Sequence, residues 1–372
     1  MSDYFVLHIR PTSSCNADCS YCSSWRMKSQ PYLSVDAYRS SIEYLRDKVL
    51  PVVSGGSMFK ALSVQFVGGE VLTLPRDYFY EIVSITRQLL EPVSQLYIHG
   101  VQSNLVGSPD RILQLDTLFS GNIGTSVETF GNRRTLAGNP LKYRQRVDSS
   151  RELLKKRRSR NVGATFVLDA QGVKYAHKEL QRAMEEEYNL VLRPVFQGRS
   201  SIDAPPMDEL EDIYMTCFDE WALKTTVHVE PFSYLLARRA KVTLCGTMCP
   251  YKADCAETSL NMDPNGDLYL CFEMADSGHF KMGNAAEKTF DIETWEKLRG
   301  RKKYAMEACG TCPYFEDCQA GCMYESLETT GTIEHATGYC PIWKKLFSRM
   351  DDLIAEHGQR RVTDWLASLD AQ

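Results

Sequence analysis

Apolar runs alternate with helical patterns along the first half of the chain. Six short runs have the length and composition of buried strands: Tyr4–Arg10, Leu62–Val67, Gln95–Val101, Gly124–Val127, Val162–Leu168 and Val191–Val195. Strands that alternate with helices predict an α/β fold with a parallel sheet and right-handed crossovers. About 200 residues for six such units favours an open, partial (β/α)6 barrel of the TIM type over the closed eight-unit form.

The pattern changes after residue 205. We expect helices over Met207–Thr225 and Ser233–Val242, and a closing helix over Trp343–Leu369 that is interrupted at Gly358. Residues 243–345 have few periodic runs and many turn residues, so bound metal must supply stability that a small core cannot. The predicted division is a barrel over 1–205, a helical linker over 206–242, a cysteine-rich domain over 243–345 and a terminal helix over 346–372.

Composition narrows the class of protein. A hydrophobic fraction of 43% supports a substantial core, and the net charge of −5 gives no sign of nucleic-acid binding. The N-terminus lacks a signal-peptide pattern, and no run of about 20 apolar residues predicts a membrane span. Without a secretory signal, 13 cysteines indicate metal ligands rather than disulfides. We therefore expect a cytoplasmic protein that binds neither nucleic acid nor membrane.

Three cysteines directly follow the first predicted strand. Cys15, Cys19 and Cys22 form a C-x3-C-x2-C run. Iron–sulfur clusters are normally held by four cysteines. Three thiolates on one loop can hold three corners of a [4Fe–4S] cube and leave the fourth iron open to a ligand. A zinc loop with a distant fourth ligand, or three unrelated buried cysteines, would have the same spacing.

Polar and glycine residues stand at the ends of later strands, where parallel α/β folds form their sites. Gly68, Gly69 and Glu70 follow the second strand, and Ser126 and Glu128 end the fourth. The two glycines allow close backbone approach, and Glu70 can accept a hydrogen bond from a ligand ammonium. The hydroxyl and the carboxylate at the fourth strand can meet a ribose.

With these motifs, residues 4–200 resemble the radical S-adenosylmethionine (radical SAM) enzymes. The resemblance implies that the three cysteines bind a [4Fe–4S] cluster whose open iron is chelated by SAM. It implies reductive cleavage of SAM to a 5′-deoxyadenosyl radical, which the protein positions against one substrate C–H bond. Gly68, Gly69 and Glu70 match the motif that holds the SAM amine. The further SAM contacts that we expect are Tyr21, Asn104, Ser126, Glu128, Arg133, Arg134 and Leu192. For Leu192, ordinary packing in the barrel core is an equal alternative to a contact with SAM.

The C-terminal cysteines have a second pattern. The run Cys309-x2-Cys312-x5-Cys318-x3-Cys322, followed by Cys340, resembles the SPASM extension of radical SAM enzymes that modify peptides and proteins. A zinc ribbon is the alternative, but it explains neither the additional cysteines nor the N-terminal run. The resemblance implies two auxiliary [4Fe–4S] clusters, and three in all. Their implied ligands are Cys249, Cys255, Cys271 and Cys322 for the first, with Cys245 as an alternative to Cys249, and Cys309, Cys312, Cys318 and Cys340 for the second.

The ligand spacing also resembles that of anaerobic sulfatase-maturing enzymes, which form formylglycine. In those enzymes an Asp directly after the third ligand of the first auxiliary cluster accepts a proton. Here Phe272 follows Cys271, and Glu273 comes next as the candidate proton acceptor. This departure favours another reaction of the same domain plan.

We therefore expect a maturase that installs a crosslink, preferably a cyclophane-type C–C bond, in a ribosomally made precursor peptide. A thioether-forming maturase is an alternative. The expected reductant is an external one-electron carrier of the flavodoxin or ferredoxin type. Because the chain begins almost at the first strand, we expect no N-terminal recognition domain. A leader peptide would then dock as an added strand on an exposed sheet edge.

Overall fold

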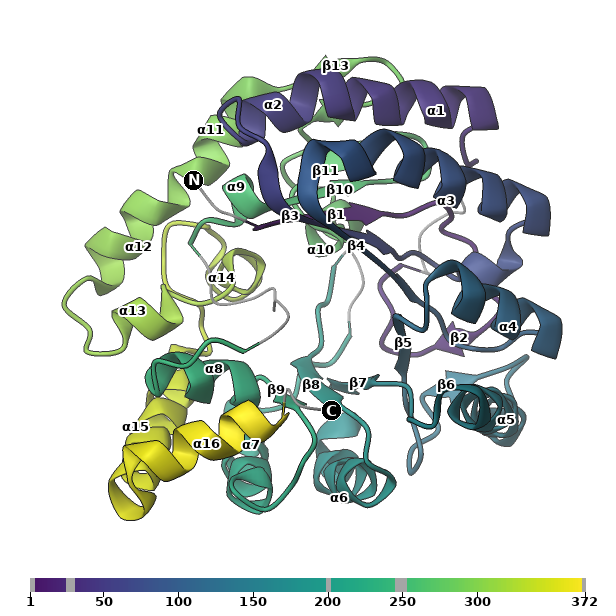
Figure 1. Cartoon of the computed structure of the whole chain (residues 1–372). Helices are drawn as coiled ribbons and strands as arrows, with labels where there is room; N and C mark the ends of the chain where they lie inside the picture. Colours follow the sequence, from purple (N-terminus) through teal and green to yellow (C-terminus); the bar gives the residue numbers. More distant parts are fainter. Residues whose placement is uncertain (1–3, 25–30, 199–201, 245–252, 370–372) are drawn as a thin grey trace.

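A single curved sheet organises the chain. The computed structural model describes residues 4–24, 31–198, 202–244 and 253–369. Within them, nine strands pair in the order β11-β10-β1-β3-β4-β5-β7-β8-β9. The β10–β11 pair is antiparallel, and the other neighbours are parallel. Helices cover the outer side of the sheet, and the C-terminal cysteine-rich segment lies at its open side (Figure 1). The predicted α/β partial barrel is confirmed.

All six predicted strands are present, within three residues of their expected ends. They are β1 (Tyr4–Ile9), β3 (Phe59–Phe66), β4 (Ser94–Gln102), β5 (Ile123–Ser126), β7 (Ala164–Leu168) and β8 (Leu190–Pro194). Three later strands extend this sheet: β9 (Val229–Glu230), β10 (Ser259–Met262) and β11 (Leu268–Tyr269). Two small antiparallel pairs lie outside it: β2 (Asp18–Cys19) with β6 (Arg134–Thr135), and β12 (Gly283–Asn284) with β13 (Thr289–Phe290).

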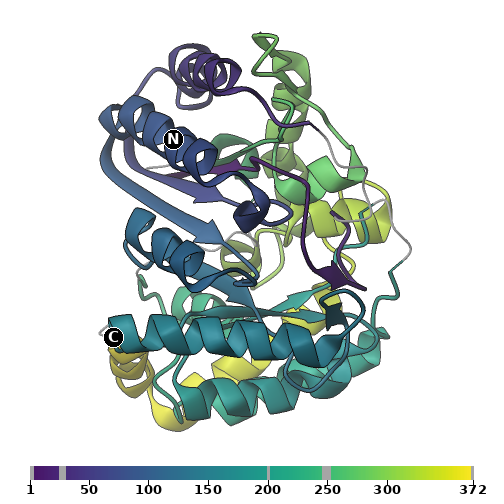
Figure 2. The same ribbon diagram turned by 90° about the vertical axis from the view of Figure 1, so that its right-hand side faces the viewer.

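The crossover helices begin where the sequence supplies caps. The side chains of Ser34, Ser108 and Asn139 each accept a hydrogen bond from a backbone N–H in the first helical turn. Figure 2 shows α1 and α3 above the strands and α5 and α6 below them, because these helices follow the outside of one curved sheet. The helices of this half are α1 (Val35–Tyr44), continued by a π-helical turn (Leu45–Val49) into α2 (Leu50–Val53), α3 (Arg76–Leu90), α4 (Pro109–Leu118), α5 (Pro140–Arg158) and α6 (Ala176–Glu186).

Helices dominate the second half. Gly358, at a φ of +83°, separates the last two, as predicted. None of the described helices combines the length and apolar composition that a bilayer crossing requires. The helices are α7 (Met207–Trp221), α8 (Phe232–Arg239), α9 (Cys255–Thr258), α10 (Phe272–Ser277), α11 (Ile292–Arg299), α12 (Arg301–Cys309), α13 (Phe315–Cys318), α14 (Met323–Thr330), α15 (Cys340–His357) and α16 (Gln359–Leu369).

Alternation along the strands divides apolar from polar side chains. In β1, Phe5, Leu7 and Ile9 are buried against the helices, whereas Val6 and His8 point to the inner face of the sheet. The same alternation in β8 buries Leu190 and Leu192 and turns Arg193 inward. By this alternation the barrel interior is polar. Its inward-facing polar side chains include His8, Gln65, Gln102, Ser126 and Arg193.

The sheet crosses the predicted domain boundary at residue 243. Strand β10 of the cysteine-rich segment pairs in parallel with β1, from Val6 opposite Ser259 to Ile9 opposite Met262. Strand β1 is therefore paired on both sides. The sheet ends instead at β9 and β11, which have two residues each. Such short edges give an added peptide strand little to pair with, which weakens the expected mode of leader docking.

Because β10 completes the sheet, residues 1–244 produced alone should not form a stable barrel. The free edge of β1 and the apolar surface that β10 covers would both be exposed to water. We expect aggregation in size-exclusion chromatography and no cooperative transition in thermal denaturation followed by circular dichroism. A monomeric fragment that melts cooperatively near the midpoint of the full chain would show that the barrel folds independently.

Candidate functional site

The glycine turn after β3 lies directly beneath the cysteine loop. The N–H of Gly69 donates to the carbonyl of Thr12 at 2.9 Å, and the N–H of Glu70 donates to that of Ser14 at 2.8 Å. A Cβ atom on Gly69 would lie 2.2 Å from the Ser14 oxygen, and one on Gly68 2.5 Å from the Thr12 oxygen. Only glycine allows this approach. The sequence predicted a close backbone contact here, and its partner is the cysteine loop.

Glu70 braces the end of β4. Its buried carboxylate accepts hydrogen bonds from the N–H of Leu72, the hydroxyl of Ser103 and the N–H of Asn104, at 2.6–3.0 Å. Burial raises the pKa of this carboxyl, and the three hydrogen bonds oppose the rise. Asn104 in turn donates to the sulfur of Cys15 at 3.7 Å. Both residues thus support the loop from below, and their contacts with SAM stay predictions.

The three cysteines share one apolar surrounding with Tyr21 and Tyr143. Backbone pairing of β2 with β6 sets Cys19 opposite Arg134. Burial raises the pKa of the Cys19 thiol to about 12, and the charge of Arg134 opposes this rise. The guanidinium donates to the hydroxyls of Tyr21 and Tyr143, each at 2.7 Å. A fixed cation beside three thiols suits a group that binds as thiolates.

Arg133 and Glu128 are engaged with each other. The guanidinium binds both oxygens of Glu128, at 3.0 and 2.5 Å, and one oxygen of Asp169 at 2.6 Å. It also lies 5.0 Å from the ring centroid of Tyr21. All three charged side chains are buried. Because this ion pair uses both carboxylate oxygens of Glu128, the structure gives these residues a role in positioning Tyr21. Their contacts with SAM stay predictions.

Ser126 and Leu192 point to opposite sides of the sheet. Ser126 faces the interior, where its hydroxyl accepts a hydrogen bond from Gln102 at 3.4 Å. Leu192 lies in the apolar layer between sheet and helices, together with Phe166 and Tyr214. This is the core packing that the sequence left open as an alternative for Leu192.

Helix α10 ties the two cysteine regions together. Arg10, at the end of β1, donates to buried Asp276 at 2.6 Å. The hydroxyls of Ser23 and Ser24, directly after Cys22, donate to the same carboxylate at 2.7 and 2.6 Å. Since α10 begins directly after Cys271, this network joins the first loop to the C-terminal cysteines. The sequence did not single out Asp276.

The same helix presents two residues to the barrel interior. Buried Glu273 forms an ion pair with Arg193 of β8. The ring of Phe272 packs edge-on against His8, with centroids 5.6 Å apart. Burial, with Arg193 and Arg10 nearby, lowers the pKa of His8 to about 4, so its imidazole is neutral. The candidate proton acceptor thus faces the interior, where a substrate would lie.

The sequence did not single out two further glutamates, both on α14. Glu325, on α14, is fully buried and accepts a hydrogen bond from Thr337 at 3.3 Å. Burial raises its pKa to about 8, and the charge of Arg193 opposes the rise. Glu328 accepts hydrogen bonds from the N–H groups of Gln197 and Gly198 at 2.6 and 3.3 Å. Glu325 and Glu328 stand three residues apart on the helix that follows Cys322, so they share one helix face. This spacing is the sequence signal that could have identified them.

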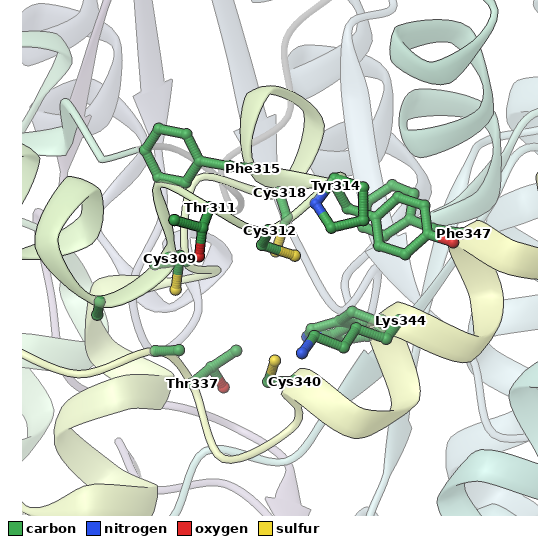
Figure 3. A pocket seen from close by; sticks show the side chains of 15 residues that line it. Cys309, Thr311, Cys312, Tyr314, Phe315, Cys318, Thr337, Cys340, Lys344 and Phe347 are labelled. Atoms are coloured by element: carbon green, nitrogen blue, oxygen red, sulfur yellow. The ribbon is translucent and has the colours of Figure 1, made fainter.

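Four of the C-terminal cysteines surround one cavity of about 420 Å³. They are the predicted set Cys309, Cys312, Cys318 and Cys340, which lie around a common space (Figure 3). Lys344 also lines this cavity. Among the described residues, no three His, Cys, Asp or Glu side chains converge on a position suited to a single metal ion.

The other predicted set is described in part. Cys255, Cys271 and Cys322 all pack against the first apolar core, beside the barrel. Cys249 and its alternative Cys245 lie outside the described residues. Gly266, at a φ of +90°, forms the turn between β10 and β11. Cys217, which belongs to neither predicted set, is buried on α7 in the second core.

Comparisons with known proteins agree with this fold. No family model matches the chain. A protein of Archaeoglobus fulgidus, described only as uncharacterised, is 20% identical over 371 residues, which cover 97% of this chain and 84% of that protein.

Among solved structures, native anSMEcpe with bound AdoMet (S-adenosylmethionine) has a TM-score of 0.70 at 15% identity, over 94% of this chain and 99% of that one. The structure of the same protein with AdoMet and the Cp18Cys peptide has a TM-score of 0.70 at 16% identity, over 95% of this chain and 99% of that one. Streptococcus suis SuiB bound to precursor peptide SuiA has a TM-score of 0.58 at 13% identity, over 91% of this chain and 76% of that one. At these identities the likeness shows the fold. The predicted resemblance is confirmed at that level.

Replacing Gly69 by alanine should disrupt the cysteine loop, because the added Cβ would overlap two carbonyl oxygens. We expect a loss of stability of about 1–3 kcal/mol, as for overpacked cores, and reduced iron binding after anaerobic reconstitution. Gly163→Ala is the matched control, since its Cβ would make only ordinary contacts at 3.5 Å or more. Equal melting temperatures and iron contents for the two variants would contradict the assigned packing.

Glu325 should make the protein less stable as pH rises. Its folded-state pKa is raised to about 8, so between about pH 4.5 and 8 the folded chain holds a proton that the unfolded chain releases. Stability therefore falls across this window. Glu325→Gln should reduce the difference in melting temperature between pH 5.5 and 8.5, whereas exposed Glu334→Gln should not. An unchanged pH dependence in Glu325→Gln would count against a buried, protonated carboxyl.

Proposed function

We propose that this chain is a radical SAM enzyme that modifies a ribosomally made peptide. The observation that carries the proposal is the position of α10. Through Asp276 it is bound to the cysteine loop, and through Glu273 it faces the polar barrel interior. The fold is shared with a structure that holds AdoMet and a peptide and with another that holds a precursor peptide, which supports the same conclusion.

The residues of the first loop fit the cofactors of such an enzyme. Cys15, Cys19 and Cys22 would hold a [4Fe–4S] cluster beside the cation of Arg134. The glycine turn, Tyr21 and Ser126 would contact SAM. When bound, the reduced cluster and SAM together supply a 5′-deoxyadenosyl radical. The protein's own task is to hold this loop rigidly, which the hydrogen bonds of Glu70 and Asn104 achieve.

The barrel interior would hold the peptide. Its walls combine neutral His8, the Arg193–Glu273 ion pair and the ring of Phe272. Arg193 lies over the rings of Phe196 and Phe272, at 4.5 and 5.4 Å from their centroids, so its side chain is held in place. It thereby orients the carboxylate of Glu273, which we propose accepts the proton that the peptide loses.

The C-terminal cysteines fit auxiliary clusters. A cavity of about 420 Å³ among four cysteines offers a [4Fe–4S] cube more room than a single tetrahedral ion needs. We propose a second auxiliary cluster on Cys255, Cys271 and Cys322, with Cys249 as fourth ligand. These centres would accept the electron that must leave after a crosslink forms. An external flavodoxin- or ferredoxin-type protein would supply the reducing electron.

The favoured product is a cyclophane-type C–C crosslink, because Phe272 stands where sulfatase-maturing enzymes carry their acidic residue. One observation keeps formylglycine formation as a second candidate. Glu273, one position later, does face the barrel interior. A carboxylate is therefore available there despite the changed sequence position.

The reconstituted protein should contain about twelve irons per chain, as three four-iron cubes require. With SAM, reductant and its peptide it should form 5′-deoxyadenosine and lower the peptide mass by two hydrogens. Replacing Cys15, Cys19 and Cys22 together by alanine should abolish both products and leave about eight irons.

Three results would refute parts of this scheme. SAM cleavage retained in the triple variant excludes the first site. Zinc without sulfide excludes the clusters. An aldehyde product in place of a crosslink identifies the formylglycine candidate.

A further inference from the structure

A buried cation lies between the two auxiliary cysteine sets. Arg301, the first residue of α12, is fully buried. Its guanidinium donates to the carbonyl of Ala320 at 3.0 Å and to those of Ile333 and His335. Its Nε has no hydrogen-bond partner, and no carboxylate among the described residues forms an ion pair with it. The charge is thus held by peptide dipoles alone.

The position of Arg301 relates it to both sets at once. Ala320 lies midway between Cys318, of the second predicted set, and Cys322, of the first. On α12, Arg301 shares a helix face with Ala305 and Cys309, at i, i+4 and i+8. Ala320 also lines the cysteine cavity. The guanidinium is therefore bonded to the short turn from which one ligand of each set departs.

Such a charge requires compensation. Burying an unpaired ion costs several kcal/mol even after relaxation of the protein, and neutral thiols offset little of that cost. The cysteines that act electrostatically on Arg301 come from both sets: Cys322, Cys255, Cys309 and Cys318. A [4Fe–4S] cube held by four thiolates is an anion. A cluster on either side would therefore give Arg301 the opposite charge that the protein itself does not provide.

We propose that Arg301 is the shared counter-charge of the two auxiliary clusters and raises the reduction potential of both. The proposal rests on the proposed function, since it requires anionic clusters at these cysteines. A fixed cation in a low-dielectric interior favours the more negative, reduced state of a nearby cluster. Because one residue faces both centres, its removal should shift both potentials in the same direction. Arg301 is fully buried and would act on both clusters through its charge.

The test measures potentials rather than turnover. Arg301→Gln and Arg301→Lys are made in the chain that lacks Cys15, Cys19 and Cys22, so that only auxiliary clusters give a signal. Each reconstituted protein is titrated with dithionite under redox mediators and followed by electron paramagnetic resonance. At a fixed poise we expect Arg301→Gln to lower the ratio of reduced to oxidised cluster at least tenfold for both centres. For a one-electron couple that corresponds to about 59 mV.

The Arg301→Lys variant keeps the positive charge, so the reduction potentials of both its auxiliary clusters should stay near those of the parent protein. Arg151→Gln is the matched control, since Arg151 is also buried but lies on α5, over the ring of Tyr188, and should leave both potentials unchanged. Loss of auxiliary iron in Arg301→Gln but not in Arg301→Lys also supports the proposal, since the charge is then needed for assembly.

Three outcomes overturn the proposal. Unchanged potentials with about eight irons retained exclude an electrostatic role while leaving the clusters established. Loss of iron in both Arg301 variants assigns the residue to its hydrogen bonds alone. If the parent protein binds no auxiliary iron, both the proposed auxiliary clusters and the proposed role of Arg301 are refuted.

Discussion

The buried ion pair between Arg10 and Asp276 links the parts of this molecule that must work together. One carboxylate receives a guanidinium from the end of the first strand and two hydroxyls from the end of the cysteine loop. A buried charge is stable only with such partners, so the loop and α10 cannot separate without large cost. The placement of Glu273 and Phe272 in the barrel interior follows from this single attachment.

The buried arginines differ in what balances them, and the difference is informative. Arg10 and Arg133 are neutralised by carboxylates. Among the described residues, Arg134 donates to two phenol hydroxyls beside Cys19, and Arg301 donates to backbone carbonyls between two groups of cysteines. Under the proposed function, anionic clusters on the neighbouring cysteines would supply the opposite charge that the described side chains do not. The buried arginines therefore fall into two groups, those paired with carboxylates and those that lie beside cysteines.

Local signals in the sequence predicted the six barrel strands, because each strand is a short apolar run followed by a helical pattern. The family resemblance, carried by the cysteine spacing, also implied the four cysteines that lie around the cavity near Cys312. Strand β10 could not be predicted, since its four residues have meaning only when β1 is beside them. Nor could the ion pair of Glu128 with Arg133, which is formed only when the loop after β5 closes. The orientation of Leu192 could be predicted from the sequence. Its neighbour Arg193 is polar and faces the barrel interior, so Leu192 must face the helices.

The pairing of Val6 with Ser259 has a consequence for how the protein is made. The first strand leaves the ribosome early, together with the cysteine loop, but its outer neighbour is synthesised only when most of the chain has emerged. Asp276, which anchors the loop, comes later still. During translation the cysteine loop therefore lacks this support, and the edge of β1 stays open until β10 has been made. The first strand and the last part of the sheet must therefore come together after most of the chain has been synthesised.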